Sequence, residues 1–255
     1  MTVKALPSET RWVTWLGRAL VELYRSSMVL FTAAPLIVAI AAIPEFLQHV
    51  VEINIGMFDS RAAAHALAAD PRRMALGYFK IAGLVLAMFA SARWWWAREH
   101  GGRWFAVRDM LPGRLLMGLV GFVGLPFIAE PLRPSLAPFA FGLLSGGLSI
   151  LSFPFLWWLL AGLFGDWVAP LAGAWRTSWG SVAGAVVLIV AAYGPAMAIH
   201  YLDHFLAFGR PALVVWPLML FDALVVGMLA TLAGAAFMLA YERFRALAVR
   251  TDAAR

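Results

Sequence analysis

The chain has 255 residues, of which 63% are hydrophobic and 13% are charged, and its formal net charge is +6. A soluble globular domain has roughly 45–50% apolar and about 25% charged residues. The composition therefore excludes an ordinary soluble enzyme and predicts a membrane protein. The sequence contains no cysteine, which excludes disulfides and thiolate metal sites.

The first predicted element is an amphipathic helix over residues 8–26. Apolar residues recur at helical spacing along one face, and Arg11 and Arg18 occupy the opposite face. A helix of this kind lies flat in the membrane interface with its apolar face in lipid. Shorter interfacial segments are predicted at 104–111 and 167–175.

Six apolar stretches predict membrane spans. A helix needs about 20 apolar residues to cross the hydrocarbon core. No stretch alternates with the period of a membrane barrel strand, so helices are the structure that satisfies the backbone in lipid. The predicted fold class is all-α, a polytopic membrane protein with six transmembrane helices. The stretches are approximately 27–47, 73–92, 113–128, 136–164, 181–201 and 211–239.

These spans predict a single transmembrane domain over residues 1–255. Consecutive spans are expected to pair as helical hairpins, and a short cytoplasmic tail is expected after the last one. The predicted segments are the interfacial helix 8–26, the hairpins 27–92, 93–165 and 166–241, and the tail 242–255.

The positive charge predicts the orientation of the chain. Most of the 20 Lys and Arg residues fall in segments that lie on one side of the membrane when both termini are on that side. The positive-inside rule makes this the cytoplasmic side, and the expected location is a bacterial inner membrane. Contact with anionic lipids at the inner face explains the net charge, and no nucleic-acid partner is expected.

A dense aromatic run follows the second span. Trp94, Trp95 and Trp96 stand between Arg93 and Arg98. Because tryptophan gathers where membrane meets water, the run predicts a lipid-interface anchor on the inner side.

A near-repeat without gaps relates the beginning and end of the chain. Its matched Arg residues lie at the inner ends of two spans, which predicts a parallel internal repeat of spans 1–2 and 5–6 about an axis along the membrane normal. Equivalent positions are then expected at equal depth. The matches are Tyr24–Ser27 with Trp175–Ser178, Pro44 with Pro195, His49 with His200, Glu52 with Asp203, and Ala82-Gly83 with Ala233-Gly234.

Histidines and carboxylates gather at the predicted outer ends of the first and fifth spans. Their spacing places each group on one helix face, and the repeat predicts that the groups lie at one depth. Such ligands suit zinc, non-haem iron or manganese, so one hypothesis is that both groups converge on a single transition metal ion. A proton-sensing cluster and ordinary polar helix ends in water are the alternatives. The candidates are Glu45, His49, Glu52, His200, Asp203 and His204.

Two charged residues fall inside predicted spans. Asp222 lies in the sixth span and Lys80 in the second. A charge inside a membrane is costly unless it is paired, and it therefore marks a functional candidate. The repeat makes these two spans counterparts, so a Lys80–Asp222 pair is expected, either as a structural salt bridge or as part of an ion or proton path.

The run Trp175-Arg176-Thr177-Ser178-Trp179-Gly180 opens the fifth span. It resembles the entry signature, an aromatic residue followed by Arg-Ser-Trp and then Gly, of the multi-pass membrane domain attached to some bacterial glycerophosphodiester phosphodiesterases. Similar stand-alone six-span bacterial membrane proteins of unknown function share it. The resemblance implies a helical membrane domain without catalytic residues of its own. The acidic residue that often precedes the signature is not matched, Asp166 being the nearest.

Three functions are weighed against these features. The leading hypothesis is a non-enzymatic scaffold, accessory or assembly subunit that packs against another membrane protein. The second hypothesis is a transporter of an ion, small solute or lipid, and it predicts that Asp222 lines a water-filled cavity. The third is a metal-binding protein or enzyme, and it predicts that His49 and His200 approach within one ligand sphere.

Overall fold

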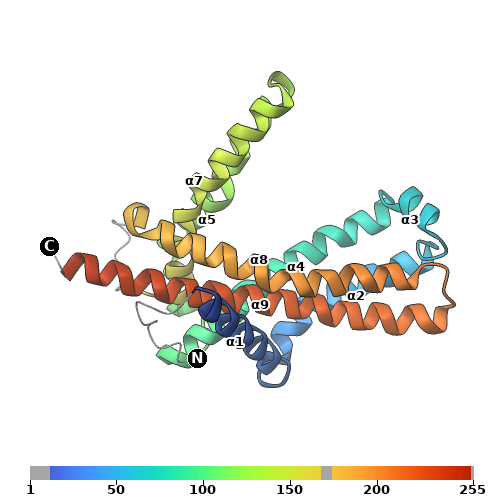
Figure 1. Cartoon of the computed structure of the whole chain (residues 1–255), viewed down its shortest axis with the longest axis horizontal. Coiled ribbons are helices and arrows are strands. Elements are labelled where there is room, and N and C mark those ends of the chain that lie inside the picture. Colours follow the sequence, from blue (N-terminus) through green and yellow to red (C-terminus); the bar gives the residue numbers. More distant parts are fainter. Residues whose placement is uncertain (1–11, 168–173, 254–255) are drawn as a thin grey trace. The chain divides into compact units, whose positions relative to one another are not determined.

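The computed structural model describes residues 12–167 and 174–253, and every regular element within them is a helix (Figure 1). Short 3-10 helices cover 107–109 and 130–135, and a π-helical turn covers 120–124. The α-helices are α1 (Trp12–Ala33), α2 (Pro35–Asn54), α3 (Arg61–Leu67), α4 (Pro71–His100), α5 (Pro112–Leu119), α6 (Leu125–Phe127), α7 (Pro138–Phe164), α8 (Ala174–Ala207) and α9 (Ala212–Ala253).

Six helical segments are long and apolar enough to cross a membrane, which confirms the predicted all-helical class and number of spans. The third span consists of α5, the π-turn, α6 and a 3-10 helix rather than one α-helix. The six segments are Pro35–Asn54, Pro71–His100, Pro112–Ser135, Pro138–Phe164, Trp179–Ala207 and Ala212–Ala248.

The first span begins later than predicted. The helix expected to end at residue 26 continues to Ala33, and the candidate span is α2, which starts at Pro35. Ala34 leaves the helical conformation, with φ −148° and ψ 58°. A residue that precedes proline is sterically disfavoured in the α region, while proline itself is well suited to the first helical position. Pro35 therefore ends one helix and starts the next.

Two other predicted boundaries differ from the structure. Residues 104–111 contain only a 3-10 helix, at Val107–Asp109, because Gly101 and Gly102 take positive φ angles just before this segment and end α4. The segment 167–175 lies largely outside the described residues. The predicted tail from residue 242 is a continuation of α9 as far as Ala253.

The chain divides into two compact units, whose boundaries fall inside α4, α8 and α9. Unit 1 comprises residues 1–95 and 187–236, and unit 2 comprises residues 96–186 and 237–255.

Small residues let the helices of unit 1 pack closely. The Ser27 hydroxyl of α1 lies 2.5 Å from the Thr231 hydroxyl of α9. A Cβ atom added at Gly83 of α4 would come 2.6 Å from the Ile40 carbonyl oxygen of α2, and one at Gly227 of α9 would come 2.8 Å from a Val38 methyl. Close backbone approach of this kind is typical of membrane helices, and it brings α2, α4 and α9 within reach of short polar side chains.

Gly234→Ala is expected to lower the free energy of unfolding by about 1–3 kcal/mol, as overpacking does. A Cβ atom there would lie 2.5 Å from both the Met88 carbonyl oxygen and the Ser91 Cβ, so α4 and α9 must separate. Gly77→Ala is the matched control, because its nearest neighbour would be 3.8 Å away. Unfolding in mixed micelles should show no loss for Gly77→Ala, and equal losses would contradict the packing.

Unit 2 contains its own polar and aromatic cluster. The buried carboxylate of Asp166 accepts hydrogen bonds from Tyr241 Oη at 3.0 Å and Arg245 Nε at 2.8 Å. Arg114 donates to the Asp166 backbone oxygen at 2.6 Å. The ring of Trp96 stacks on Phe164 with centroids 4.8 Å apart.

The Trp-Arg run differs from the predicted lipid belt. Arg93, Trp95 and Trp96 are buried within the chain, Trp94 is half-buried, and Arg98 is exposed. Consecutive residues of a helix are turned by about 100°, so the side chains of this run cannot all face lipid. Of the five, Trp94 and Arg98 have the exposed surface that a headgroup contact needs.

Candidate metal centre

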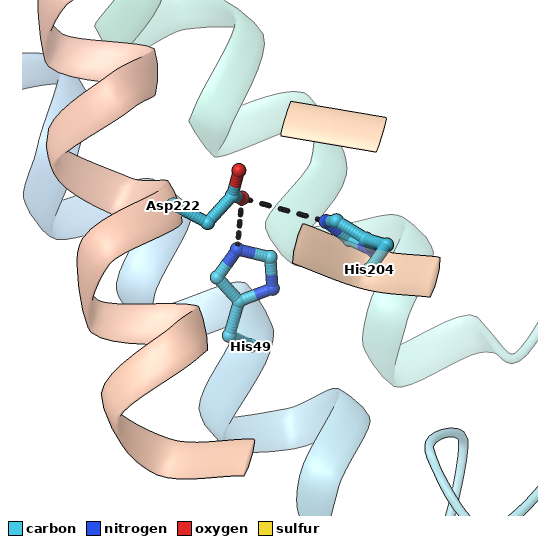
Figure 2. Close-up of side chains that lie close together, drawn as sticks. All are labelled: His49, His204 and Asp222. Carbon is cyan, nitrogen blue, oxygen red and sulfur yellow. Dashed lines mark hydrogen bonds and ion pairs between the residues drawn. The ribbon is translucent and has the colours of Figure 1, made fainter. Parts of the chain in front are cut away.

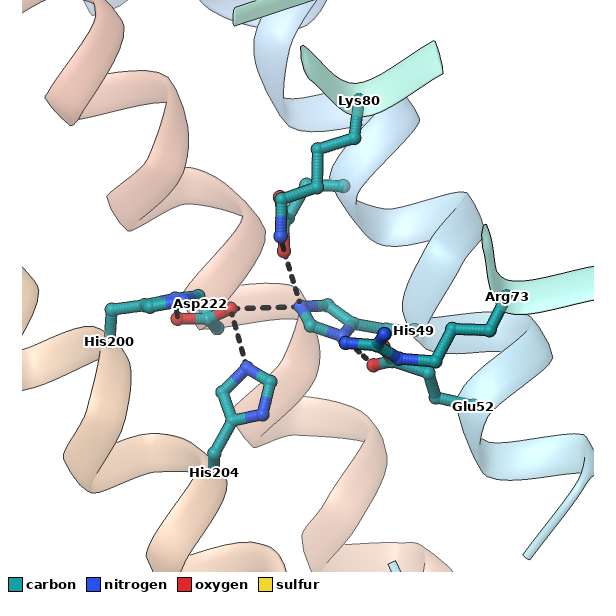
Figure 3. A network of polar contacts seen from close by, with 8 residues as sticks. His49, Glu52, Arg73, Lys80, His200, His204 and Asp222 are labelled. Atoms are coloured by element: carbon teal, nitrogen blue, oxygen red, sulfur yellow. Dashed lines mark hydrogen bonds and ion pairs between the residues drawn. The ribbon is translucent and has the colours of Figure 1, made fainter. Parts of the chain in front are cut away.

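A polar cluster lies inside unit 1, built from α2, α8 and α9 (Figures 2 and 3). Glu45, His49 and Glu52 share one face of α2, as their spacing predicts, and are at most 2% exposed. The cluster also contains His200 and His204 from α8 and Asp222 from α9. The hypothesis of polar helix ends in water is therefore wrong for the α2 group, because burial removes those side chains from solvent.

The α8–α9 hairpin explains why Asp222 meets the histidines. The chain reverses between Ala207 and Ala212 through Gly209, whose positive φ of 68° suits glycine. His200 lies about two turns before the end of α8, and Asp222 lies about three turns after the start of α9. The two helices run side by side (Figure 1), so these positions fall at nearly the same level.

Asp222 is the centre of the cluster and is fully buried. Its Oδ2 lies 2.8 Å from Nε2 of His49 and 3.4 Å from Nε2 of His204. Its Oδ1 lies 2.6 Å from Nδ1 of His200. Figure 3 shows the three imidazoles converging on this one carboxylate.

His49 lies between two carboxylates. Its Nε2 faces Asp222, while its Nδ1 lies 2.9 Å from Oε2 of Glu52. A neutral imidazole has one N–H and one lone pair, so it can donate to only one of them. If Nδ1 donates to Glu52, the Nε2 lone pair points at an oxygen of Asp222. That contact is repulsive unless a proton or a metal cation occupies the position.

Arg73 holds Glu52 in place. Its Nε donates to Oε1 of Glu52 at 2.8 Å, and its Nη1 donates to the Ala68 carbonyl at 2.9 Å. Just before it, Asp70 caps α4 by accepting from the backbone N–H of Arg72 at 2.9 Å. The Arg72 guanidinium also hydrogen-bonds this carboxyl and lowers the pKa of Asp70. The start of α4 therefore fixes the arginine that orients Glu52.

The expected Lys80–Asp222 pair is wrong. Lys80 Nζ donates instead to Oε1 of Glu45 at 2.8 Å. The reason is that Gly83 seats α4 directly on α2, which places Lys80 beside Glu45. The same Glu45 oxygen lies 3.3 Å from Nε2 of His49. The other oxygen of Glu45 is buried without a hydrogen-bond partner within the described ranges.

Two predicted ligands stand outside the innermost set. Among the described residues, the Glu52 carboxylate has hydrogen bonds with His49 Nδ1, on the side of the ring away from Asp222, and with Arg73. Asp203 is 5% exposed, and its Oδ2 has no hydrogen-bond partner in the described part of the chain. It is near enough to Asp222, His200 and His204 for electrostatic interaction with them. Both carboxylates therefore surround the centre rather than complete it.

Two groups of side chains are arranged so that each could hold a metal ion. One is His49, His204 and Asp222, and the other is Glu45, His200 and Asp222; within a group, one ligand atom from each residue lies within 4.8 Å of the others. With metal–ligand bonds of about 2.0–2.2 Å, neighbouring ligand atoms of one ion are about 3.0–3.5 Å apart. The separations of 2.8, 3.3 and 3.4 Å around His49 and Asp222 are close to that range.

The sequence identified Asp222 as a candidate but not its partners, and it did not indicate Arg73 or Phe58. Asp222 was paired with Lys80 rather than with the histidines, although folding the last hairpin about Gly209 would have placed it opposite His200. Arg73 was overlooked because it lies at a helix start. Phe58, whose ring centroid is 5.8 Å from that of His204 and 6.5 Å from that of His49, lies in a loop without a recognisable pattern.

The fold and the cluster together define a class, an all-helical protein with six candidate membrane spans and a buried histidine–carboxylate centre. No family model, curated protein or solved structure matches the chain. The resemblance of Trp175–Gly180 to the phosphodiesterase membrane domain stays a prediction. The case for a function therefore rests on the residues of the centre.

Proposed function

We propose that this protein is an integral membrane metalloprotein that binds one divalent transition metal ion, such as zinc, iron or manganese, at Asp222. The observation that carries the proposal is the position of His49 between Glu52 and Asp222. A histidine that binds a metal through one ring nitrogen donates the N–H of its other ring nitrogen, often to a carboxylate, which fixes the ring and raises its basicity. Glu52, which Arg73 holds in position, would be the carboxylate that accepts this N–H from His49.

The charges around the centre support a divalent cation. Four carboxylates, including Asp203, are buried there. They are balanced by two cations, Arg73 and Lys80, so with neutral imidazoles two negative charges remain. Uncompensated charge is costly to bury, and one divalent ion would neutralise it.

The residues present fit such an ion. His49, His204 and Asp222 would supply the first ligands, with His200 and Glu45 within reach as further ones. Imidazole and carboxylate are suitable ligands for zinc, iron and manganese. An ion held this way supplies a Lewis acid or activates a bound water. Glu45, which keeps one buried oxygen unpartnered, is the group placed to accept a proton beside it.

The topology and the internal repeat belong to this proposal. With both termini in the cytoplasm of a bacterium, the cluster lies towards the outer face of the inner membrane. The parallel repeat is supported by the contact of His49 and His200 with the two oxygens of one aspartate, which is what equal depth requires. The counterparts differ locally, since the chain breaks at Ala34 between α1 and α2 while α8 is continuous.

The scaffold hypothesis has one observation in its favour. Gly142 and Gly146 of α7 have open space where a Cβ atom would stand, as a face that receives another helix would have. The transporter hypothesis expects a wet cavity at Asp222, whereas the Asp222 side chain is fully buried among imidazoles. The metal hypothesis expects His49 and His200 in one ligand sphere, and it is favoured by their contact with the two oxygens of the same aspartate, although the two histidines fall in different candidate ligand groups.

Metal content is the measurement that tests the proposal. Gently purified wild-type protein is expected to carry about one transition metal ion per chain, by elemental analysis and native mass spectrometry. His49→Ala should lose it, whereas His65→Ala, an exposed histidine of α3, should keep it. Glu52→Gln, which preserves shape, should weaken affinity about 10–100-fold.

The same spectra separate the alternatives. A wild-type chain without metal, both as purified and after incubation with zinc, iron or manganese, would refute the proposal. A stoichiometric second polypeptide on a metal-free chain would instead favour the scaffold hypothesis.

A further inference from the structure

A second site lies in unit 1, at the ends of the candidate spans. A cavity of about 320 Å³ is lined by Arg61, Ala64 and His65 of α3 and by Phe205 and Phe208 at the end of α8. Ligand pockets are typically about 300–1,000 Å³, so this one has room for a small headgroup and the first part of a chain. None of these residues belongs to the metal centre.

The wall formed by α3 is basic. Arg61 and His65 are one helical turn apart and share a face, and Ser60 caps the helix by accepting from Ala63 N at 3.0 Å. Within residues 12–167 and 174–253, Arg61 has no carboxylate at ion-pair distance. Its guanidinium instead lies 4.2 Å from the ring centroid of Phe205. That contact positions the guanidinium, whose five N–H groups remain available to a ligand.

The opposite wall is aromatic. Phe208 packs on Phe58 with centroids 6.0 Å apart, and Phe58 in turn contacts the rings of His204 and His49. Layers of aromatic side chain therefore separate the cavity from the metal centre. The cavity combines a fixed cation with an apolar surface.

Membrane geometry indicates which ligand meets this combination. Phe205 lies in the last turn of the fifth candidate span, and α3 connects the first span to the second. The cavity is thus at headgroup level when these spans cross a bilayer. A charged phosphate beside an alkyl chain is the chemistry available at that level.

We propose that this cavity binds an anionic amphiphile, a phosphate-bearing lipid whose headgroup contacts Arg61 and His65 and whose chain begins against Phe205 and Phe208. Guanidinium and phosphate form charge-assisted, often bidentate hydrogen bonds. The site stands apart from the metal centre and does not depend on it.

Binding of a short-chain lipid tests the site. The full-length protein in an uncharged detergent is titrated with dihexanoyl phosphatidylglycerol below its micellar concentration, and binding is followed by calorimetry and native mass spectrometry. We expect at least about tenfold tighter binding than for dihexanoyl phosphatidylcholine. Arg61→Gln should weaken phosphatidylglycerol binding about tenfold, as the loss of a charged hydrogen-bond donor does.

Arg72→Gln is the matched control. The Arg72→Gln variant removes the same charge from a neighbouring helix. Arg72 is exposed and paired with Asp70, so lipid binding should not change. Equal losses for Arg61→Gln and Arg72→Gln would show general attraction to surface charge and overturn the site. If inorganic phosphate alone binds as tightly as phosphatidylglycerol, the aromatic wall contributes nothing. The ligand would then be a free anion rather than an amphiphile, and the proposal would be overturned. Arg61→Lys, which keeps the charge without the planar stack, should lie between wild type and Arg61→Gln.

Discussion

Asp222→Ala is expected to lower the free energy of unfolding of the metal-free protein by about 3–5 kcal/mol, the range for removing one partner of a buried charged network. Three imidazoles converge on this carboxylate, and His49 and His200 lose their hydrogen-bond partner together. The measurement is equilibrium unfolding in mixed micelles with a chelator present.

Asp203→Ala supplies the comparison for Asp222→Ala. Asp203 is also a buried aspartate next to the cluster, but its Oδ2 accepts no hydrogen bond in the part of the chain that the structure describes. Removing it relieves repulsion from Asp222, so the loss should be below about 1 kcal/mol. If the two variants lose equal stability, the cluster is not organised around Asp222.

Lys80→Met is expected to lower the free energy of unfolding of the metal-free protein by about 3 kcal/mol, because it strands a buried carboxylate. Glu45 is fully buried, and Lys80 is the one Lys or Arg at hydrogen-bond distance from it among the described residues. The double variant Glu45→Gln/Lys80→Met removes both charges and should recover most of that loss. A double-mutant cycle in chelator measures the coupling.

The single variant Glu45→Gln completes the cycle and should cost less than Lys80→Met, since the side chain of Lys80 is 26% exposed whereas Glu45 is fully buried. Additive losses across the cycle would mean that the pair does not form. A cycle repeated with Asp222→Asn in place of Glu45→Gln should show little coupling, because Lys80 contacts Glu45.

Much of the fold could be predicted because its causes are local. Apolar length fixed the number of spans, and the spacing of Glu45, His49 and Glu52 placed them on one face of α2. Helix ends depended on finer detail. The first helix runs past residue 26 because the apolar residues before Pro35 continue its pattern, and the break comes only at Ala34.

The contacts of the site were harder to predict because they depend on which helices touch. Nothing near Lys80 in the sequence indicates that α4 will pack closely on α2 at Gly83. That packing places Lys80 within hydrogen-bond distance of Glu45. The depth of Asp222 could be predicted from its position in the sixth span. Its contact partners depend on the turn at Gly209, which places α9 beside α8. The burial of Trp95 and Trp96 could not be predicted for a related reason, since composition alone does not say which ring of a helix turns inward.

Asp222 and His49 are 173 residues apart in the chain, and this separation has a consequence for how the protein is made. During synthesis the N-terminal helices are complete long before the last hairpin emerges. Until α9 is added, α4 can already pair Glu45 with Lys80 and Glu52 with Arg73, but His49 lacks the aspartate that completes the network. The nascent chain therefore carries a half-assembled polar cluster that its own C-terminal helix must complete. A chain that stops before Asp222 is left with that cluster unfinished.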